Sequence, residues 1–529
     1  MSDQKRLLLA AVLMAAVLFI SWQFMGKSGT SESSQVSQQA TEYVQPEQLP
    51  VIDDSTSIDK QSVENASDKT HNIDIEEILP EERDIKVIVY DGDNVIVEAD
   101  ISTAGGTVLG WRLPQYEDMP GAGTSESISF DGNRWTNNSS YFETLSEDTI
   151  LVDEIPQTLV LIDPSGESEI RYTFTPGQYG FLYETDGFSD ITVLNAGILP
   201  VSEMNSNISR YFKAQWNAEK VRSRGSNSIT EDAQVGNVEW IAARSQYFAV
   251  IMMPQSYDRA YGFLYASAED ESPSIGLQDN RIYVYAGPLD YGRLRSLGRD
   301  TSRLVDFGWP IIRDIGRLLF WFCTSVLSFV SNWGIKIILL AIVLKLVLMP
   351  LTTKSFKSMA MLKQVQPKMK ELQEKYKSDP KALQSAMQKL YREEGVNPLG
   401  GCLPLIMQMP VFFALYRVLA NSVQLRGAPF ILWIQDLSKP EILIPFQSSI
   451  LGLHGIGILA LLMGIAMFLQ QKMTMTDQNQ KGMMYMMPIF MTFLFMRFPA
   501  GLTMYWFSNS LLTIWQQQLI KKKLEAGQN

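Results

Sequence analysis

The chain changes its pattern of apolar and polar positions near residue 305. Before that point, short runs such as KVIVY and RIYVYAG alternate apolar with polar residues and are separated by turn signals such as Asp91-Gly92. Strict alternation is typical of half-buried β-strands. After that point the apolar runs approach twenty residues, the length that an α-helix needs to cross a bilayer. The pattern predicts an antiparallel β-sandwich domain followed by an α-helical membrane region.

Six apolar runs are long enough to be membrane spans. The first, 7–25, follows Lys5 and Arg6 and has no small-residue cleavage site at its end, so we expect an uncleaved anchor, with a signal peptide as the alternative. The other five runs are 333–351, 402–420, 450–469, 483–498 and 502–520. The stretch 310–330 carries Arg313, Asp314 and Arg317 among apolar residues, which is typical of a helix lying in the membrane interface.

These patterns divide the chain into segments with different expected roles. They are an N-terminal transmembrane anchor (1–27), a flexible linker (28–75), a β-sandwich domain (76–305), an interfacial amphipathic helix (306–331), a helical core (332–523) with a helical hairpin (355–395) inside it, and a C-terminal tail (524–529). In the hairpin, Asp379 is expected to cap the second helix, with Pro380 at its first position. Pro367 and Pro380 are expected to interrupt the helices.

The positions of lysine and arginine near the spans predict the orientation in the membrane. With six spans, the basic residues of the short loops and ends fall on one side, at Lys5-Arg6, 354–392, Lys472 with Lys481, and 521–523. That side is expected to be the cytoplasm. Both termini are then inside, while the β domain and the loop 425–449 are outside. The chain has a net charge of −12, and most of its acidic residues precede residue 305.

Lys345 is a cation deep inside an apolar run. A lysine near the membrane centre costs about 2.5–3.5 kcal/mol on insertion scales, so it indicates a polar cavity or a partner. Lys336 is near the entry of the same run and is expected to snorkel to the interface, which is also the alternative for Lys345. A polar stripe at helical spacing and one further glutamine could line the cavity or hydrogen-bond neighbouring helices. They are Tyr505, Ser508, Asn509, Thr513, Gln516 and Gln408.

Several classes of site are excluded or disfavoured by composition. The only fragment of a phosphate-binding loop, Gly26-Lys27-Ser28, lacks the first glycine, so an ATP-driven machine is not expected. The two histidines, His71 and His454, do not support a zinc site or a histidine-based hydrolase. The two cysteines, Cys323 and Cys402, lie in apolar segments and are expected to be buried free thiols. No cofactor, metal site, catalytic residue or specific nucleic-acid motif is expected.

Three long stretches resemble one family in the right order. They are MPLTTKSFKSMA, NPLGGCLPLIMQMPVFFALY and FPAGLTMYWFSNSLLTIWQQQLI, and they are similar to the YidC/Oxa family of membrane protein insertases, specifically its Gram-negative bacterial type with a large periplasmic domain. The resemblance implies a five-helix insertase core with a hydrophilic groove open to cytoplasm and lipid, and a periplasmic β-supersandwich. It implies a multi-pass protein of the bacterial inner membrane that inserts and helps fold nascent membrane proteins, alone or with the Sec translocon, and is not an enzyme.

The resemblance also implies residue roles. The family's groove cation, usually arginine, falls on Lys345, which keeps the charge but loses the planar fork of donors. The expected substrate-binding residues are Lys345, Gln408, Phe412, Leu494, Tyr505, Trp506, Asn509 and Thr513. The expected cytoplasmic docking residues, for which a merely solvated hairpin is the alternative, are Lys363, Lys368, Lys370 and Lys375. The expected partners are nascent membrane proteins, the ribosome, the Sec translocon with accessory components, and the phospholipid bilayer.

Two other functions compete with this interpretation. A secondary transporter also uses a buried cation and helices broken by proline, as at Pro404, Pro410 and Pro488, but the chain shows no internal repeat. A carbohydrate-active enzyme could share the sandwich, although fold alone does not imply function.

Overall fold

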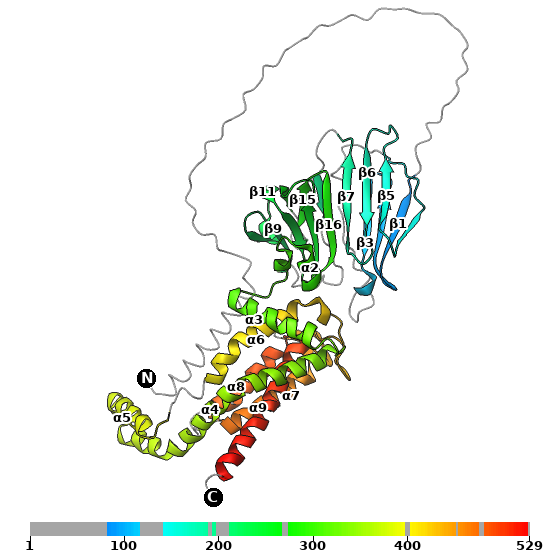
Figure 1. Cartoon of the computed structure of the whole chain (residues 1–529). Helices are drawn as coiled ribbons and strands as arrows, with labels where there is room; N and C mark the ends of the chain where they lie inside the picture. Colours follow the sequence, from blue (N-terminus) through cyan, green and yellow to red (C-terminus); the bar gives the residue numbers. More distant parts are fainter. Residues whose placement is uncertain are drawn as a thin grey trace, which may run out of the picture.

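The computed structural model describes residues 82–116, 141–188, 193–196, 211–266, 273–396, 403–450, 453–474 and 481–526. The predicted anchor and linker and residue Cys402 lie outside the described residues. A β-rich region spans 82–288 and a helical region follows it to residue 526, as the pattern predicts (Figure 1). The classification of the first region as a β-supersandwich stays a prediction.

The described strands of the β-rich region form three sheets. The first, ordered β3-β2-β1-β4, contains β1 (Asp84–Asp91), β2 (Asn94–Ser102), β3 (Thr107–Arg112) and β4 (Thr149–Val152). The second, ordered β10-β9-β12-β13-β16-β7-β6-β5, contains β5 (Gln157–Ile162), β6 (Glu169–Phe174), β7 (Gly180–Asp186), β9 (Lys213–Asn217), β10 (Val221–Gly225), β12 (Trp240–Arg244), β13 (Phe248–Pro254) and β16 (Arg281–Pro288). The third, ordered β11-β14-β15-β8, contains β8 (Val193–Ala196), β11 (Ala233–Val238), β14 (Ala260–Tyr265) and β15 (Ser274–Gln278).

The burial of strands follows their sequence patterns. β1 alternates, with Ile85, Val87 and Val89 buried, whereas every residue of β13 is buried, which explains why its sequence FAVIMMP does not alternate. The expectation of wholly antiparallel pairing is wrong at one place, because β1 and β4 pair in parallel. A parallel neighbour needs a long connection, and β2 and β3 lie between β1 and β4 in the sequence.

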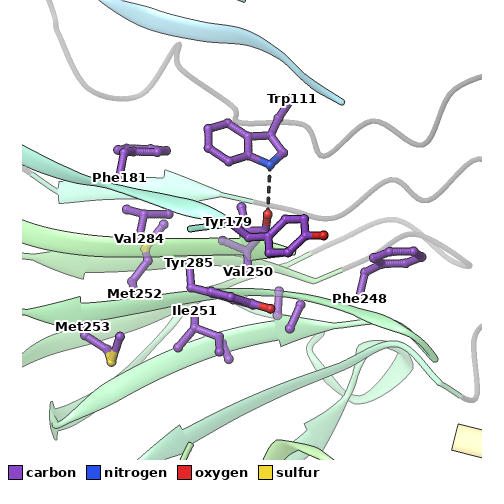
Figure 2. Packing of buried hydrophobic residues seen from close by; sticks show 14 of the residues in the cluster. Trp111, Tyr179, Phe181, Phe248, Val250, Ile251, Met252, Met253, Val284 and Tyr285 are labelled. Carbon is purple, nitrogen blue, oxygen red and sulfur yellow. Dashed lines mark hydrogen bonds between the residues drawn. The ribbon is translucent and has the colours of Figure 1, made fainter. Parts of the chain in front are cut away.

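The sheets share one hydrophobic core. Trp111 of β3 is fully buried, and its Nε1 donates to the Ala286 carbonyl oxygen of β16 at 2.9 Å (Figure 2). Its ring lies 5.4 Å from that of Phe181 in β7. A buried indole needs such an acceptor for its N–H, so this bond fixes the first sheet on the second.

The helical region contains helices, one β-hairpin and short helical turns. The helices are α2 (Tyr291–Leu297), α3 (Pro310–Trp321), α4 (Trp333–Lys375), α5 (Pro380–Glu393), α6 (Leu403–Asn421), α7 (Ile458–Thr474), α8 (Lys481–Phe495) and α9 (Ala500–Ala526). The hairpin is β17 (Ile444–Ile450) with β18 (Leu453–Ile456). The short helical turns of this region are Thr301–Leu304, the π-helix Phe322–Val326, and Val423–Leu425. The β-rich region contains two more, Pro114–Tyr116 and Ser226–Ser228.

Two expectations about the helices are corrected. α4 runs unbroken through Pro350 and Pro367, so the first hairpin helix continues the span instead of starting at 355, because one proline removes a single helical hydrogen bond. The predicted span 450–469 begins too early, since α7 starts at Ile458, after the β17–β18 hairpin, which contains Gly455. Lys336 is buried and its Nζ lies 4.6 Å from the ring centre of Trp333, the first residue of α4, so its expected snorkelling to the interface stays a prediction.

The predicted cap of the second hairpin helix is confirmed. Asp379 Oδ1 accepts from the backbone N–H groups of Lys381 and Ala382, each at 3.1 Å, and Pro380 is the first residue of α5. These bonds satisfy two of the N–H groups that a helix start leaves without partners. Figure 1 shows α5 at the end of α4, away from the other helices.

Among the described residues, α4 alone is long and apolar enough to cross a membrane by length and composition, while α7 and α8 contain shorter apolar helices. The count of six spans therefore stays a prediction. α3 buries Ile312, Gly316 and Leu319 and exposes Ile311 and Leu318. It packs along α6. Exposed leucine and isoleucine on a packed helix suit an interfacial position, which also stays a prediction.

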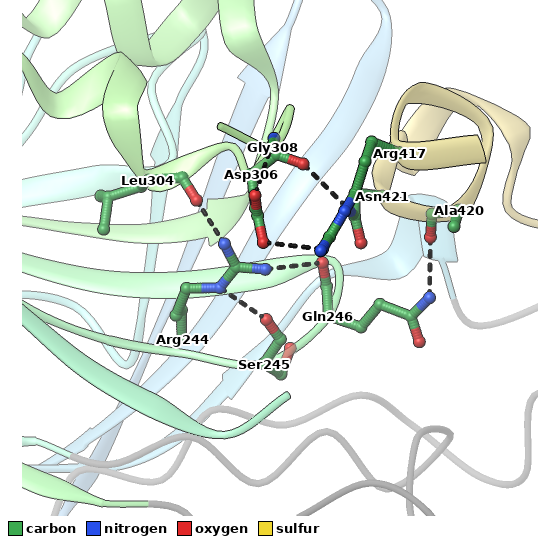
Figure 3. Close-up of polar contacts among 9 residues, drawn as sticks. All are labelled: Arg244, Ser245, Gln246, Leu304, Asp306, Gly308, Arg417, Ala420 and Asn421. Carbon is green, nitrogen blue, oxygen red and sulfur yellow. Dashed lines mark hydrogen bonds and ion pairs between the residues drawn. The ribbon is translucent and has the colours of Figure 1, made fainter. Parts of the chain in front are cut away.

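A polar seam, defined here by Arg244, Gln246, Asp306, Arg417 and Asn421, joins the β-rich region to the C-terminal end of α6 (Figure 3). Arg417 Nη1 lies 3.1 Å from Asp306 Oδ2, and Asn421 Nδ2 donates to the Asp306 carbonyl oxygen at 2.8 Å. Gln246 Nε2 donates to the Ala420 carbonyl oxygen at 2.7 Å. The last bond ties the end of α6 to the β-rich region, and the first two tie it to Asp306, in the segment that leads from that region to α3.

The electrostatics of the seam favour an ionised Asp306. Burial alone would raise the pKa of Asp306, but Arg417, Arg244 and Lys213 outweigh burial and hold it below its ordinary value of 3.8. Apolar contacts accompany the charges, because Val418 joins the hydrophobic core of the β-rich region. The seam therefore combines core packing with a compensated charge cluster.

Candidate functional site

Lys345 lies in α4 with 9 % of its surface exposed. Its Nζ donates to Thr513 Oγ1 of α9 at 2.7 Å, and Thr513 Oγ1 donates to the Asn509 carbonyl oxygen at 2.7 Å. Within the described ranges, no carboxylate forms an ion pair with Lys345. A hydroxyl offsets only part of the cost of burying an ammonium, so the site holds a cation that the fold leaves largely uncompensated.

A second polar cluster joins the same two helices. Gln516 Nε2 donates to Thr352 Oγ1 at 2.9 Å and to Thr353 Oγ1 at 3.0 Å. Gln516 belongs to the polar stripe that the sequence predicts, whereas neither threonine was predicted. Thr352 follows Lys345 by seven residues, close to two helical turns, so its place on the same face of α4 was readable from spacing.

The polar residues expected around Lys345 form two groups rather than one. Lys345 is with Thr513, whereas Tyr505 is buried and lies within hydrogen-bonding reach of Gln408. Tyr505 and Thr513 are eight residues apart on α9, which is about 12 Å of rise. Gln516 and Thr513 also bond helix to helix, as the alternative interpretation of the stripe expects.

The cavity described in this region is apolar and separate from Lys345. It has a volume of about 400 Å³ and lies between α4, α7, α9 and the loop 430–434. Its lining includes Ile342, Leu459 and Leu511 but not Lys345. The hydrophilic groove therefore stays a prediction.

Phe412 of α6 lies in a cluster of aromatic side chains. Its ring centre is 5.3 Å from that of Trp506, 6.3 Å from Phe495 and 6.4 Å from Phe498. Leu494 packs against the same hydrophobic core. The structure thus brings together the apolar candidates from α6, α8 and α9.

One face of α8 is exposed and apolar. It carries Tyr485, Met486, Ile489 and Phe490, of which Ile489 has 69 % of its surface exposed. Leu494 was the predicted substrate-binding residue of this helix, and the exposed face was not predicted, although positions 485, 486, 489 and 490 recur at helical spacing. A long apolar face on a membrane helix is available to lipid or to an apolar partner.

The four candidate docking lysines are exposed, but two already have partners. Lys363 Nζ donates to the Met473 carbonyl oxygen at the end of α7 at 2.7 Å, and Lys368 Nζ lies 2.6 Å from Glu394 Oε1. The pKa of Lys363 is lowered by burial and then by the positive charge of Lys521. The helical hairpin therefore lies close to the basic end of α9. Lys375 lies over the Tyr376 ring. Lys370 is exposed.

Comparisons with known proteins agree on one family. A family model described as 60Kd inner membrane protein matches residues 325–527. A protein of Chlorobium luteolum named membrane protein insertase YidC is 33 % identical over 488 residues, covering 82 % of this chain and 83 % of its own length. The chain belongs to the YidC family of membrane protein insertases. A YidC relative in Wolinella succinogenes is 35 % identical over 415 residues, covering 74 % of this chain and 72 % of its own length.

Two further comparisons concern proteins named YidC. The Haemophilus influenzae relative is 37 % identical over 314 residues, covering 56 % of this chain and 55 % of its own length. A solved structure titled as an active YidC insertase crystal structure aligns with 82 % of this chain and 94 % of its own, at 19 % identity and a TM-score of 0.38. The assignment rests on the sequence relatives. Because these relatives are named insertases, the transporter alternative is not supported.

Proposed function

We propose that this chain inserts nascent membrane proteins into the bilayer and helps them fold, without covalent chemistry. The observation that carries the proposal is Lys345, a buried cation that the described residues compensate with one hydroxyl, in a chain of the insertase family. A partner that brings negative or polar groups past Lys345 would be stabilised there. The same groups would meet a higher barrier in plain hydrocarbon.

The proposed path has a polar and an apolar side. A short polar segment would pass Lys345, Thr513 and Asn509, and then Tyr505, about 12 Å further along α9. Gln408 of α6 lies beside Tyr505 there. The following apolar segment would slide past Phe412, Trp506 and Leu494, and along the exposed face of α8 that includes Ile489. Aromatic and methionine side chains suit this role because they accept apolar partners of different shapes.

We also propose the surroundings of this path. The chain would cross the bacterial inner membrane six times, with residues 7–25 as the first span, both termini in the cytoplasm and the β-rich region in the periplasm. α3 would lie in the interface, and the hairpin lysines would meet the ribosome or the nascent chain. The Sec translocon would take part for some substrates.

Site-specific photocrosslinking tests the proposal. A photoreactive residue at position 345 or 513 should crosslink to a stalled nascent membrane protein. Val347, two residues from Lys345 and 68 % exposed on the same helix, is the matched control position and should crosslink to lipid instead. Equal crosslinking of the nascent chain from 345 and 347 would show that the chain does not pass Lys345 specifically.

A further inference from the structure

A polar pocket of about 290 Å³ lies between the β-rich region and the loop that follows α6. Its wall includes Arg293 and Asp290 from the start of α2, and Gln424 and Arg426 from the loop. Tyr179, which Figure 2 shows among the buried residues of the core, also lines the pocket. The proposed function uses none of these residues.

Two arginines in the wall carry positive charge that would attract an anion. Arg293 donates to the Gly177 carbonyl oxygen and to Asp91, both at 2.9 Å, and a guanidinium carries five N–H groups, so three remain beyond these bonds. Arg426 is 6 % exposed and lies 5.3 Å from the Phe248 ring centre. Burial lowers the pKa of Arg426 to about 10, against the effect of Asp436, so an anion placed beside it would favour its charged form.

One carboxylate shares the pocket. Asp290 Oδ1 accepts from the Arg293 backbone N–H at 2.7 Å, and Oδ2 accepts from Gln424 Nε2 at 2.5 Å. A carboxylate has about four acceptor positions, so it can receive a further donor such as an ammonium. Two guanidinium groups and one carboxylate suit a zwitterion better than a polyanion, because a polyanion would meet Asp290 repulsively.

The pocket lies close to the expected membrane surface. Val423, Gln424 and Arg426 follow Asn421, the last residue of α6, by two to five positions. On its other side, Tyr291 of α2 packs on Phe320 of α3, with ring centres 6.2 Å apart. The headgroup layer of a bilayer is about 5–8 Å thick on each side, so residues this close to a span end lie within its reach.

We propose that this pocket binds the headgroup of an outer-leaflet phospholipid, with the phosphate between Arg293 and Arg426 and the ammonium of an ethanolamine headgroup near Asp290. Phosphate and guanidinium match in geometry, and charge-assisted bonds between them are strong. The bound lipid would join the β-rich region, the α6 loop and the bilayer. This proposal goes beyond insertion, and its test does not measure insertion.

Calorimetric titration of the full chain in non-ionic detergent tests the site. The probes are water-soluble dihexanoyl phosphatidylethanolamine, dihexanoyl phosphatidylglycerol and inorganic phosphate. The wild type should bind the ethanolamine lipid most tightly, and Arg293→Gln and Arg426→Gln should each raise the Kd about tenfold or more. Asp290→Asn should remove the preference for ethanolamine over glycerol while keeping phosphate binding.

Two matched variants separate the site from general charge effects. Arg295→Gln removes an exposed arginine of the same helix that does not line the pocket, and Asp91→Asn breaks the ion pair of Arg293 without removing its charge. Arg295→Gln should keep the wild-type Kd, and Asp91→Asn should not weaken binding, because Arg293 keeps its charge and loses a competing acid. If Arg426→Gln does not fold, Arg293→Gln compared with Asp91→Asn still decides the question.

Several results would overturn the proposal. One is a lipid Kd that is the same in the wild type and in Arg293→Gln. Another is inorganic phosphate that binds as tightly as either lipid with the same dependence on the arginines, since the site would then hold free phosphate. A third is an acidic peptide that binds with this dependence while neither lipid binds.

Discussion

Arg417 and Lys345 are cations on neighbouring helices of the helical region, and the fold treats them differently. Arg417 lies 3.1 Å from Asp306 and belongs to a seam of bonds with the β-rich region. Lys345 has one hydroxyl at 2.7 Å and, in the part of the chain that the structure describes, no acid. A cation whose charge is compensated contributes to the fold, whereas one that is left without an acid costs stability and is retained for what it binds.

The largest expected effect is on insertion by Lys345→Glu. If Lys345 attracts a polar or acidic segment, reversing its charge should reduce insertion of substrates with acidic translocated tails at least about tenfold. Lys345→Arg keeps the charge and should retain most of the activity. The measurement is insertion into vesicles reconstituted with equal amounts of each variant. Wild-type activity of Lys345→Glu on acidic-tailed substrates would contradict the role of charge.

Asp306→Asn should destabilise the protein because it leaves Arg417 and Arg244 without their acid. The Asp306 side chain keeps 38 % exposure, so solvent screens part of the loss, and we expect about 1–3 kcal/mol in the free energy of unfolding. The pKa of Asp306 is lower in the folded state than its ordinary value of 3.8. The contribution of Asp306 to the free energy of unfolding is therefore fully present above pH 3.8 and is lost as the pH falls through the lower native pKa.

Thermal unfolding of wild type and Asp306→Asn across pH checks both parts of this prediction. The difference in Tm should be largest near neutral pH and should shrink as the pH falls below 3.8. Asp314→Asn, which changes an exposed acid of α3, is the control and should leave Tm nearly unchanged. A pH-independent difference would mean that the charge of Asp306 is not what stabilises the seam.

Lys345→Met should stabilise the protein, in contrast to Asp306→Asn, which should destabilise it. Removing an uncompensated buried charge while keeping the apolar length should raise the free energy of unfolding by about 1 kcal/mol, even though insertion falls. Arg417→Met removes a compensated charge and should lower it. Tm values of the two variants in one detergent check this contrast. If Lys345→Met is clearly less stable than wild type, then Lys345 stabilises the fold, as Arg417 does, and the contrast between the two cations is wrong.

The two sites also differ in how far the sequence predicts them. Lys345 is visible as a charge inside an apolar run, and Thr352 could have been found by counting seven residues from it. The seam was not predicted, because Asp306 and Arg417 are 111 residues apart and nothing local marks them as partners. Local sequence patterns show the spacing of apolar residues and a charge that interrupts it, whereas pairing between residues far apart in the sequence depends on the packed fold.

The same limit explains the errors in the fold. Alternation predicted strands such as β1, but it contains no information on direction, so the parallel pairing with β4 was missed. Pro367 was expected to interrupt the first helix of the helical hairpin, yet α4 continues through it, where buried Val365 packs in one cluster with Leu390 and Val396. In both places tertiary contacts outweigh a local preference.

Thr513→Val should have the smallest effect and should show how much the hydroxyl contributes. It removes the bond from Lys345 while nearly keeping the volume, and hydrogen bonds between membrane helices average about 0.6 kcal/mol, so Tm should fall only slightly. Insertion should be largely retained, because the charge of Lys345 remains. Thr503→Val is the matched control, at a buried threonine of α9 whose hydroxyl lies 3.4 Å from the carbonyl oxygens of Phe495 and Pro499 and does not contact Lys345. If Thr513→Val abolished insertion at unchanged Tm, the hydroxyl rather than the ammonium would be the group that meets the substrate, and the contrast between Lys345 and Arg417 would have to be drawn at Thr513 instead.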